Sequence, residues 1–142
     1  MSIRDEKVAL DTNVWIFGLR HPPEAPACAL LLDRLGELNV VLPRQILREL
    51  QANLAEAEMK TLFRLVKRYA KRVAIRAEMA DMQVIRKYQD RGCRLGDAVV
   101  TAHLEELGVD ALVTENRHFL EEIRGLPFRT LTAREALAEL QK

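Results

Sequence analysis

The chain has 142 residues, which is enough for one domain that buries a core without disulfides or a structural metal. Hydrophobic residues make up 49% of it and charged residues 30%, a mixture that argues against disorder as the main state. The 22 basic and 21 acidic side chains leave a net charge of +1, so the overall charge indicates no class of partner.

The first half of the chain predicts strands that alternate with helices. Residues 7–10 form a short apolar run that stops at Asp11, as a buried strand that ends in a polar turn does. A short helix over 14–19, a loop with three prolines over 21–26 and a helix over 28–37 are expected next. A second strand follows over 39–42, and Pro43 suits the first turn of a helix over 44–54.

The second half continues this alternation. Helices are expected over 56–70 and 77–90, with a brief extended piece at 73–75 between them. A loop with two glycines precedes a helix over 97–107 that Gly108 ends, and strands are expected over 111–113 and 128–131. A capping box at Thr132 opens the last helix, 132–140. Apolar strands that alternate with helices predict a single-domain α/β fold, a parallel sheet with helices on both faces.

The two cysteines and the apolar runs indicate a compartment. Cys28 and Cys93 have no CxxC pairing and no metal-ligand spacing, which predicts two free buried thiols in a reducing cytosol, with one disulfide as the alternative. No leader of the secretory kind opens the chain, and no apolar run approaches the roughly 18 residues of a membrane span. We therefore expect a cytoplasmic protein with no membrane contact.

Several familiar sites are absent from the sequence. It contains no GxxxxGK[ST] loop, no GxGxxG after a strand and no GxSxG elbow. Its three histidines, His21, His103 and His118, lack the spacing of zinc ligands. Among the kinds of site considered, the sequence therefore leaves one that is built from carboxylates.

Polar residues do gather where a parallel sheet forms its sites, just beyond the carboxyl ends of strands. Asp11 ends the first strand, Glu115 and Asn116 follow the third, and Asp97 opens a helix after a glycine loop. Taken singly, each aspartate can be explained as a helix cap, and Glu115 and Asn116 as turn residues. Glu49 can likewise belong to a solvated stripe with Gln45 and Asn53, so only the combination indicates a site.

Four segments carry a resemblance. They are LDTNVWI (10–16), ILREL (46–50), GCRLGDAVVTAHLEELG (92–108) and LVTENRHF (112–119). In this order they resemble the PIN-domain family, specifically the small VapC-like toxins, from Val8 to about Leu131. The resemblance implies a PIN-like fold and an endoribonuclease that needs Mg²⁺ or Mn²⁺. It also implies an RNA substrate, a cognate antitoxin protein and a homodimer.

The resemblance assigns roles position by position. Asp11, Glu49 and Asp97 match the family's first three acids and would hold the metal, supported by Thr12, Asn13 or Thr114. The usual fourth acid falls at the neutral Asn116, which puts a second metal in doubt. Glu115 should point elsewhere, because side chains reverse direction after one extended step.

The chemistry of these residues fits that assignment. Two carboxylates about 5 Å apart repel each other by roughly 3 kcal/mol at an effective dielectric constant of about 20, and a divalent cation relieves that repulsion. Asp11 and Asp97 are expected to bind the ion directly, while Glu49 binds it or orients the attacking water. Asn116 would hold Asp11 or a metal-bound water by a hydrogen bond. The family implies products with a 5′-phosphate and a 3′-hydroxyl.

A basic run supplies a candidate contact for RNA. Between residues 60 and 76 the chain has seven basic side chains and no acidic one. They are Lys60, Arg64, Lys67, Arg68, Lys71, Arg72 and Arg76. Their spacing predicts a stripe on one helix face that follows a phosphate backbone, although a plain solvated face is the alternative.

Two other functions stay open. A PIN-like module that has lost catalysis and only binds RNA or a protein is kept open by Asn116. A phosphotransfer enzyme similar to the haloacid dehalogenases needs D-x-D at the first strand, and here Asn13 stands two residues after Asp11.

Overall fold

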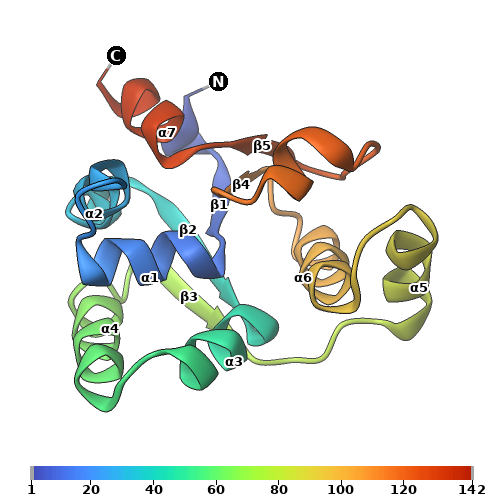
Figure 1. Cartoon of the computed structure of the whole chain (residues 1–142), viewed down its shortest axis with the longest axis horizontal. Helices are drawn as coiled ribbons and strands as arrows, with labels where there is room; N and C mark the ends of the chain where they lie inside the picture. Colours follow the sequence, from blue (N-terminus) through green and yellow to red (C-terminus); the bar gives the residue numbers. More distant parts are fainter. Residues whose placement is uncertain (1, 142) are drawn as a thin grey trace.

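A computed structural model describes residues 2–141, which form one layered α/β domain around a single sheet (Figure 1). All strand pairings in that sheet are parallel, and the strand order is β3-β2-β1-β4-β5. The strands are β1 (Lys7–Leu10), β2 (Asn39–Pro43), β3 (Val73–Arg76), β4 (Ala111–Val113) and β5 (Arg129–Leu131). The predicted fold class is confirmed.

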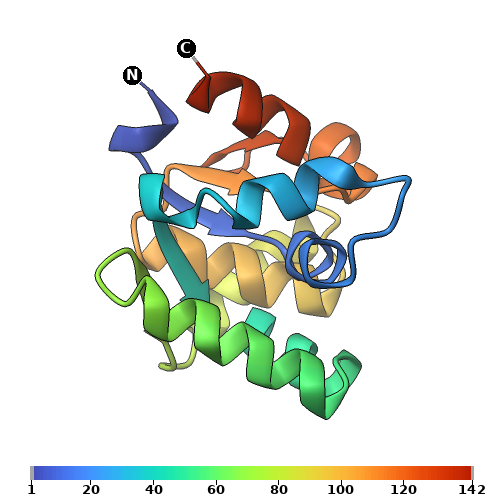
Figure 2. The same cartoon turned by 90° about the vertical axis from the view of Figure 1, so that its left-hand side faces the viewer.

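Helices cover both faces of the sheet. They are α1 (Thr12–Arg20), α2 (Pro26–Leu32), α3 (Arg44–Asn53), α4 (Glu56–Arg68), α5 (Met82–Asp90), α6 (Leu95–Glu106) and α7 (Ala133–Leu140). Shorter turns are η1 (Ile3–Asp5), η2 (Leu35–Glu37) and the π-helical η3 (His118–Glu122). Figures 1 and 2 show α1, α2 and α4 on one face and α6 on the other, with α5 packed outside α6.

The burial of β1 and α6 follows from their central positions. Val8, Ala9 and Leu10 of β1 are fully buried because the strand has neighbours on both edges and helices on both faces. Helix α6 lies between the sheet and α5, so its buried residues lie on more than one side of the helix. That position explains why its sequence lacks a clear polar face.

The order of the strands creates a switch point. The chain moves from β1 to β2 and β3 on one side and then returns to β4 and β5 on the other. At the seam between β1 and β4, Leu10 is in register with Val113. Connections that leave in opposite directions open a crevice at the carboxyl ends of two such strands, where ligands bind in sheets of this kind. Asp11 directly follows Leu10 at this crevice.

Three predicted elements differ most from the structure, while α1 and α6 each begin two residues earlier than expected. The helix expected over 28–37 is α2, which begins earlier at Pro26, followed by the separate turn η2. The helix expected from 77 begins only at Met82, where Asp81 caps it by accepting a hydrogen bond from the backbone N–H of Gln83 at 2.7 Å. The brief piece at 73–75 is a full strand, although only Val73 in it is buried.

Other local predictions are confirmed. Thr132 and Glu135 form the capping box of α7, and Gly108 adopts a positive φ of 67° after α6. Cys28 and Cys93 are free and buried. Within residues 2–141, no helix has both the length and the apolar character that crossing a bilayer requires.

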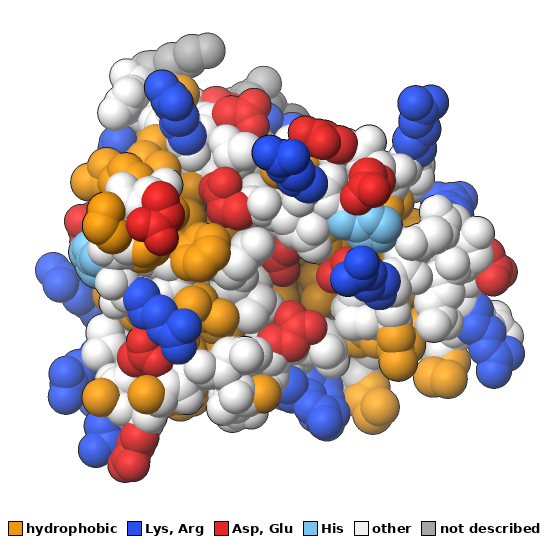
Figure 3. Space-filling view, viewed as in Figure 1, with side chains coloured by type: hydrophobic (Ala, Val, Ile, Leu, Met, Phe, Trp, Pro, Cys, Tyr) orange, Lys and Arg blue, Asp and Glu red, His pale blue; other side chains and the backbone are white. Residues whose placement is uncertain are grey.

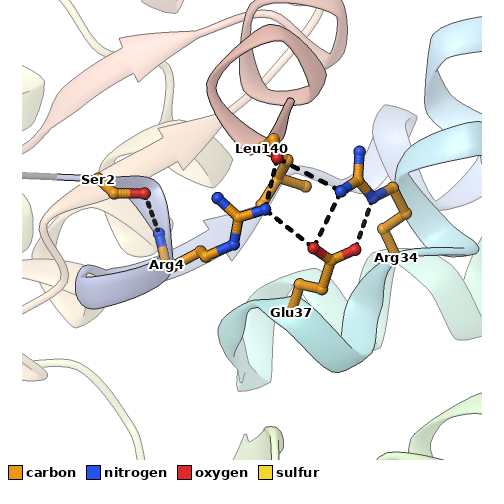
Figure 4. A network of polar contacts seen from close by, with 5 residues as sticks. All are labelled: Ser2, Arg4, Arg34, Glu37 and Leu140. Atoms are coloured by element: carbon orange, nitrogen blue, oxygen red, sulfur yellow. Dashed lines mark hydrogen bonds and ion pairs between the residues drawn. The ribbon is translucent and has the colours of Figure 1, made fainter. Parts of the chain in front are cut away.

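A polar network ties the two ends of the described chain together, as Figure 4 shows. The carboxylate of Glu37 accepts from Arg4 at 3.0 Å and from Arg34 at 2.6 Å, and both arginines also donate to the carbonyl of Leu140. Arg34 first and Arg4 second lower the pKa of Glu37 to about 2. The network thus joins η1, η2 and the end of α7 at the edge of the sheet opposite the crevice.

Candidate active site

Asp11 lies at the carboxyl end of the central strand and caps α1. Its Oδ1 accepts the backbone N–H of Thr12 at 2.9 Å, and its Oδ2 accepts the hydroxyl of Thr114 at 2.7 Å. The residue is only 7% exposed, and this burial raises the pKa of its carboxyl to about 6. The two hydrogen bonds lower that pKa and the charges of Asp97 and Glu49 raise it, so all three acids share one electrostatic environment.

Glu49 reaches the same place from α3. Its Oε1 accepts the hydroxyl of Thr12, and its Oε2 accepts the side-chain amide of Gln45 at 3.1 Å. A Cβ atom at Gly96 would lie 3.3 Å from Oε2 of Glu49, so glycine lets the start of α6 approach α3 closely. The polar stripe expected with Gln45 and Asn53 exists, but its central residue faces the crevice.

Asp97 is in the first turn of α6, and Arg94 rather than Asp97 is the N-cap residue. The helix-cap explanation of this aspartate is therefore wrong, whereas for Asp11 it is correct. The pKa of Asp97 is raised, and burial is the largest cause. The next largest effect is that of His118, which lowers the pKa, followed by Glu49, which raises it, and Arg94, which lowers it. Figure 3 shows acidic side chains around a hollow in the middle of this face, with a histidine beside it.

The three carboxylates come from three separate elements, and the packing of α3 against both α1 and α6 brings them together. Within residues 2–141, however, no three acidic, histidine or cysteine side chains converge tightly enough to enclose an ion. Thr12 and Gln45 hold Glu49, and Thr114 holds Asp11, so part of the oxygen set is bonded within the protein. The oxygen donors suit a hard cation such as Mg²⁺, which binds through one or two carboxylates and keeps several waters.

The supporting residues divide into those that hold the acids and those that do not. The hydroxyl of Thr12 donates to Glu49 and that of Thr114 donates to Asp11. The amide oxygen of Asn13 is buried and has no hydrogen-bond partner in the described part of the chain.

Asn116 does not hold Asp11, which corrects one of the two roles expected for it. Its side-chain oxygen accepts the backbone N–H of His118 at 3.0 Å, while its own N–H donates to the hydroxyl of Thr114 at 3.0 Å. Glu115 points away from the hollow, as expected, and accepts the backbone N–H of Ala133 at 2.9 Å. The turn after β4 therefore supports the site mainly through Thr114.

His118 is a residue whose place beside the acids was not predicted, since only zinc binding was considered for it. Its Nδ1 lies 3.1 Å from Oε2 of Glu122 and its Nε2 lies 3.2 Å from the carbonyl of Gly92. Both partners are acceptors, so both contacts are hydrogen bonds only in the doubly protonated ring. The histidine thereby joins η3 to the loop before α6. Its position inside the LVTENRHF segment was the available signal.

The basic run lies away from the acids. Six of its seven side chains are exposed on α4 and the turn after it, and Lys60 pairs with Glu56 at 3.6 Å. The seventh, Arg76, ends β3 and pairs with Glu78 at 2.8 Å. The carbonyl of Arg72 accepts from Val40 near the start of β2, and its guanidinium donates to Asn39. The part of the run from Lys67 to Arg72 is therefore at the amino edge of the sheet, opposite the carboxylates, whereas Arg76 is at the carboxyl end of β3.

Comparison with known proteins supports the fold. No protein-family model matches the sequence, and no curated protein does either. VapBC2 from Rickettsia felis, bound to a DNA fragment from its promoter, has a similar structure with a TM-score of 0.60 and 15% identity over 89% of this chain and 98% of that one.

Two further solved structures are similar. PAE2754 from Pyrobaculum aerophilum has a TM-score of 0.57 and 15% identity, with both chains covered completely. FitAcB from Neisseria gonorrhoeae has a TM-score of 0.55 and 18% identity over 89% of this chain and 98% of that one. At such identities the likeness establishes the PIN-like fold.

Proposed function

We propose that this protein is a metal-dependent endoribonuclease, and that it acts as the toxin of a toxin–antitoxin pair. One observation carries the proposal most. Asp11, Glu49 and Asp97 come from three different elements, and their charges act on one another at the switch point of a parallel sheet. Partly buried carboxylates that repel one another destabilise the fold, and a bound cation would relieve that repulsion.

The metal would be Mg²⁺ or Mn²⁺, held by Asp11 and Asp97 with Glu49 beside them. Bound there, such an ion supplies an activated water and neutralises charge on the phosphate oxygens. The raised pKa values of Asp11 and Asp97 support this assignment, because neighbouring positive charge would restore both carboxyls to their ionised form.

The chain's own residues do the positioning. Thr114 and the backbone N–H of Thr12 fix both oxygens of Asp11, so this carboxylate keeps one orientation. Thr12 and Gln45 fix Glu49 in the same way, which leaves it placed to accept a proton from a water or to orient it. Asn116 is a candidate to hold a water at the rim.

The structural neighbours and the VapC-like segments support the proposed partners. VapBC2 is bound to a DNA fragment from its promoter, and FitAcB is a second neighbour with a similar fold. We propose that this chain binds an antitoxin protein, forms a homodimer and acts on RNA. We also propose a cytoplasmic location, because its two cysteines are free and the cytosol keeps thiols reduced.

Cleavage of a mixed RNA pool tests the proposal. The purified chain is incubated with Mg²⁺, with Mn²⁺ and with chelator, beside an Asp97→Asn variant. The matched control is Asp33→Asn, an exposed aspartate at the end of α2. We expect cleavage that requires metal, vanishes in Asp97→Asn and persists in Asp33→Asn. Cleavage by Asp97→Asn at the full rate would overturn the assignment.

A second candidate is a PIN-like module that binds RNA or a protein without cutting it. Two observations favour it: Asn116 replaces the family's fourth acid, and no three ligands in residues 2–141 enclose an ion as the side chains stand. A calorimetric titration with Mn²⁺ separates the candidates, because the binding module predicts no heat that depends on Asp97.

A further inference from the structure

A second hollow adjoins the acidic site. It lies between α3, α5 and α6 and has a volume of about 360 Å³. It shares Gln45 with the acidic site, since this amide donates to Glu49 and also lines the hollow. Leu95, which stands two residues before Asp97, lines it as well. We call this hollow the side pocket.

The side pocket collects the most exposed apolar side chains of the described chain. Among residues 2–141, Met79, Met82 and Leu95 are exposed by 75%, 63% and 63%, more than any other large hydrophobic residue, and all three line this pocket. Figure 3 shows hydrophobic side chains in the lower right of this face, below and beside the acidic hollow. Exposed apolar groups that gather at one place indicate a binding surface.

The same pocket carries positive charge that is mostly uncompensated. Arg44, Arg48 and Arg86 line it, and neither Arg48 nor Arg86 has a carboxylate partner in the part of the chain that the structure describes. Glu78 is the acid among the lining residues, and it pairs with Arg76 at 2.8 Å. Apolar side chains with unpaired guanidinium groups beside them suit a ligand in which a flat apolar group is attached to anionic groups.

We propose that the side pocket binds the base of an unpaired nucleotide close to the phosphate that is cut, and that Arg48 and Arg86 contact the phosphates on either side of it. This proposal rests on the nuclease function above. A base is available to such a pocket only when it is unpaired, because paired bases are stacked inside a helix. Thioether and aliphatic side chains and guanidinium planes pack on the face of any base.

The size and place of the side pocket favour a base over a protein segment. Its volume falls in the range of pockets that enclose small ligands, about 300–1,000 Å³. An RNA strand that places one phosphate at the carboxylates must also place a neighbouring nucleotide beside them. Gln45 and Leu95 put the side pocket at that position.

Binding is measured by fluorescence anisotropy with a labelled single-stranded RNA, in Mg²⁺ and in the Asp97→Asn background so that the RNA stays intact. Met82→Ser and Arg86→Ala are compared with Leu30→Ser and Arg134→Ala, which change similarly exposed residues on α2 and α7. We expect Met82→Ser and Arg86→Ala each to weaken binding by about tenfold, the effect of losing one base or phosphate contact. The two controls should stay within about twofold of the parent, and Met82→Ser should leave duplex binding unchanged.

Photocrosslinking with the unmodified chain needs no variant to fold. Single-stranded RNA that carries 4-thiouridine is irradiated with the protein, and the attached peptides are identified by mass spectrometry. We expect attachment to the segments 44–48 or 79–95, which line the side pocket. Attachment only elsewhere, or an unchanged dissociation constant in Met82→Ser, overturns the proposal. If Met82→Ser instead halves the mass in solution while RNA binding is unchanged, the side pocket is an interface with a second copy and the proposal falls.

The outcome for the side pocket is separable from the outcome for catalysis. If the unmodified protein cleaves RNA while Met82→Ser and Arg86→Ala bind like the parent, the nuclease stands and the side pocket proposal fails. If nothing is cleaved but both variants weaken binding, the side pocket stands and the nuclease fails. If the chain binds no single-stranded RNA, both are overturned.

Discussion

The hydroxyl of Thr114 donates to Oδ2 of Asp11 at 2.7 Å, which joins the residues that directly follow β4 and β1. Both side chains are buried, and the bond crosses the seam at which the sheet changes direction. Because it stabilises the ionised carboxylate, this bond lowers the pKa of Asp11 and opposes the larger effect of burial. Thr114 therefore controls how far Asp11 is ionised near neutral pH.

Replacing Thr114 with valine tests that control. Thr114→Val keeps the shape but removes the donor, so the pKa of Asp11 should rise above its value of about 6. Bonds to charged groups contribute about 1.5–3 kcal/mol, so cleavage at pH 6 should fall roughly tenfold or more and recover at higher pH. The measurement is a pH–rate profile of RNA cleavage. Thr114→Ser, which keeps the hydroxyl, should follow the parent, and a profile of unchanged shape in Thr114→Val would count against the role.

The stability of the metal-free protein should depend on Asp11. Its pKa is raised in the folded state, from 3.8 to about 6, so the folded chain holds this proton more tightly than the unfolded chain does. The free energy of unfolding therefore falls as the pH rises from about 4 to about 6, by up to about 3 kcal/mol from this group alone. Asp11→Asn removes this loss. Urea denaturation in chelator at pH 4.5 and pH 7 should show parent and variant diverging, with Asp33→Asn matching the parent.

Metal binding should restore that stability and show the opposite pH dependence. A cation that binds only the folded chain raises the melting temperature, and it must displace the proton from Asp11. Below pH 6 the affinity for Mn²⁺ should thus fall by about tenfold for each pH unit, if one proton is displaced. Melting curves with and without Mn²⁺ at pH 5 and pH 7.5 check this. An equal shift at both values would show that Asp11 is not a ligand.

Glu115 should matter for stability and not for cleavage. It accepts the backbone N–H of Ala133 at the start of α7, so Glu115→Ala loses a helix-end contact of the kind that contributes about 1 kcal/mol. We expect a lower melting temperature and an unchanged cleavage rate at a temperature where both proteins are folded. A large loss of cleavage in Glu115→Ala would instead place this carboxylate in the catalytic group.

How well the elements could be predicted depended on which forces fix them. Strands β1, β2 and β4 were predicted within one residue at each end because continuous apolar runs mark strands buried on both faces. The edge strand β3 has the shorter apolar run Val73–Ile75, which predicted only a brief extended piece, and its pairing with β2 defines it as a strand that ends at Arg76. The start of α5 was missed because Asp81, a clear capping residue, was placed inside a longer helical pattern.

The site divides in the same way. The proposal of Asp11, Glu49 and Asp97 as the site rests on their segments, but their hydrogen bonds depend on which helices pack together. The contact of Thr12 with Glu49 exists because α1 lies against α3, a relation between residues 37 positions apart. The place of the basic run also depends on packing. Its spacing predicted one helix face, but α4 ends at Arg68, and the residues after it lie at the amino edge of the sheet.

The distance between the basic run and the acidic hollow yields a prediction about RNA length. Helix α4 has 13 residues and so spans about 20 Å, and its last turn, with Lys67, lies at the far edge of the sheet. A short RNA in the acidic hollow cannot reach Lys67 and Lys71, whereas a long one can bend around α4. Lys67→Ala/Lys71→Ala should therefore weaken binding of a long RNA and leave that of a short oligonucleotide unchanged.

Salt titrations make this quantitative. Each lost phosphate contact lowers the slope of log affinity against log salt by about 0.7 for single strands, so the double variant should lose about 1.4 with the long RNA. Arg124→Ala/Arg134→Ala, which removes two exposed charges elsewhere on the surface, is the matched control and should keep the parent slope. If the double variant keeps the parent slope with the long RNA too, the run is an ordinary solvated face. If it weakens the short RNA equally, the bound strand follows α4 directly from the carboxylates.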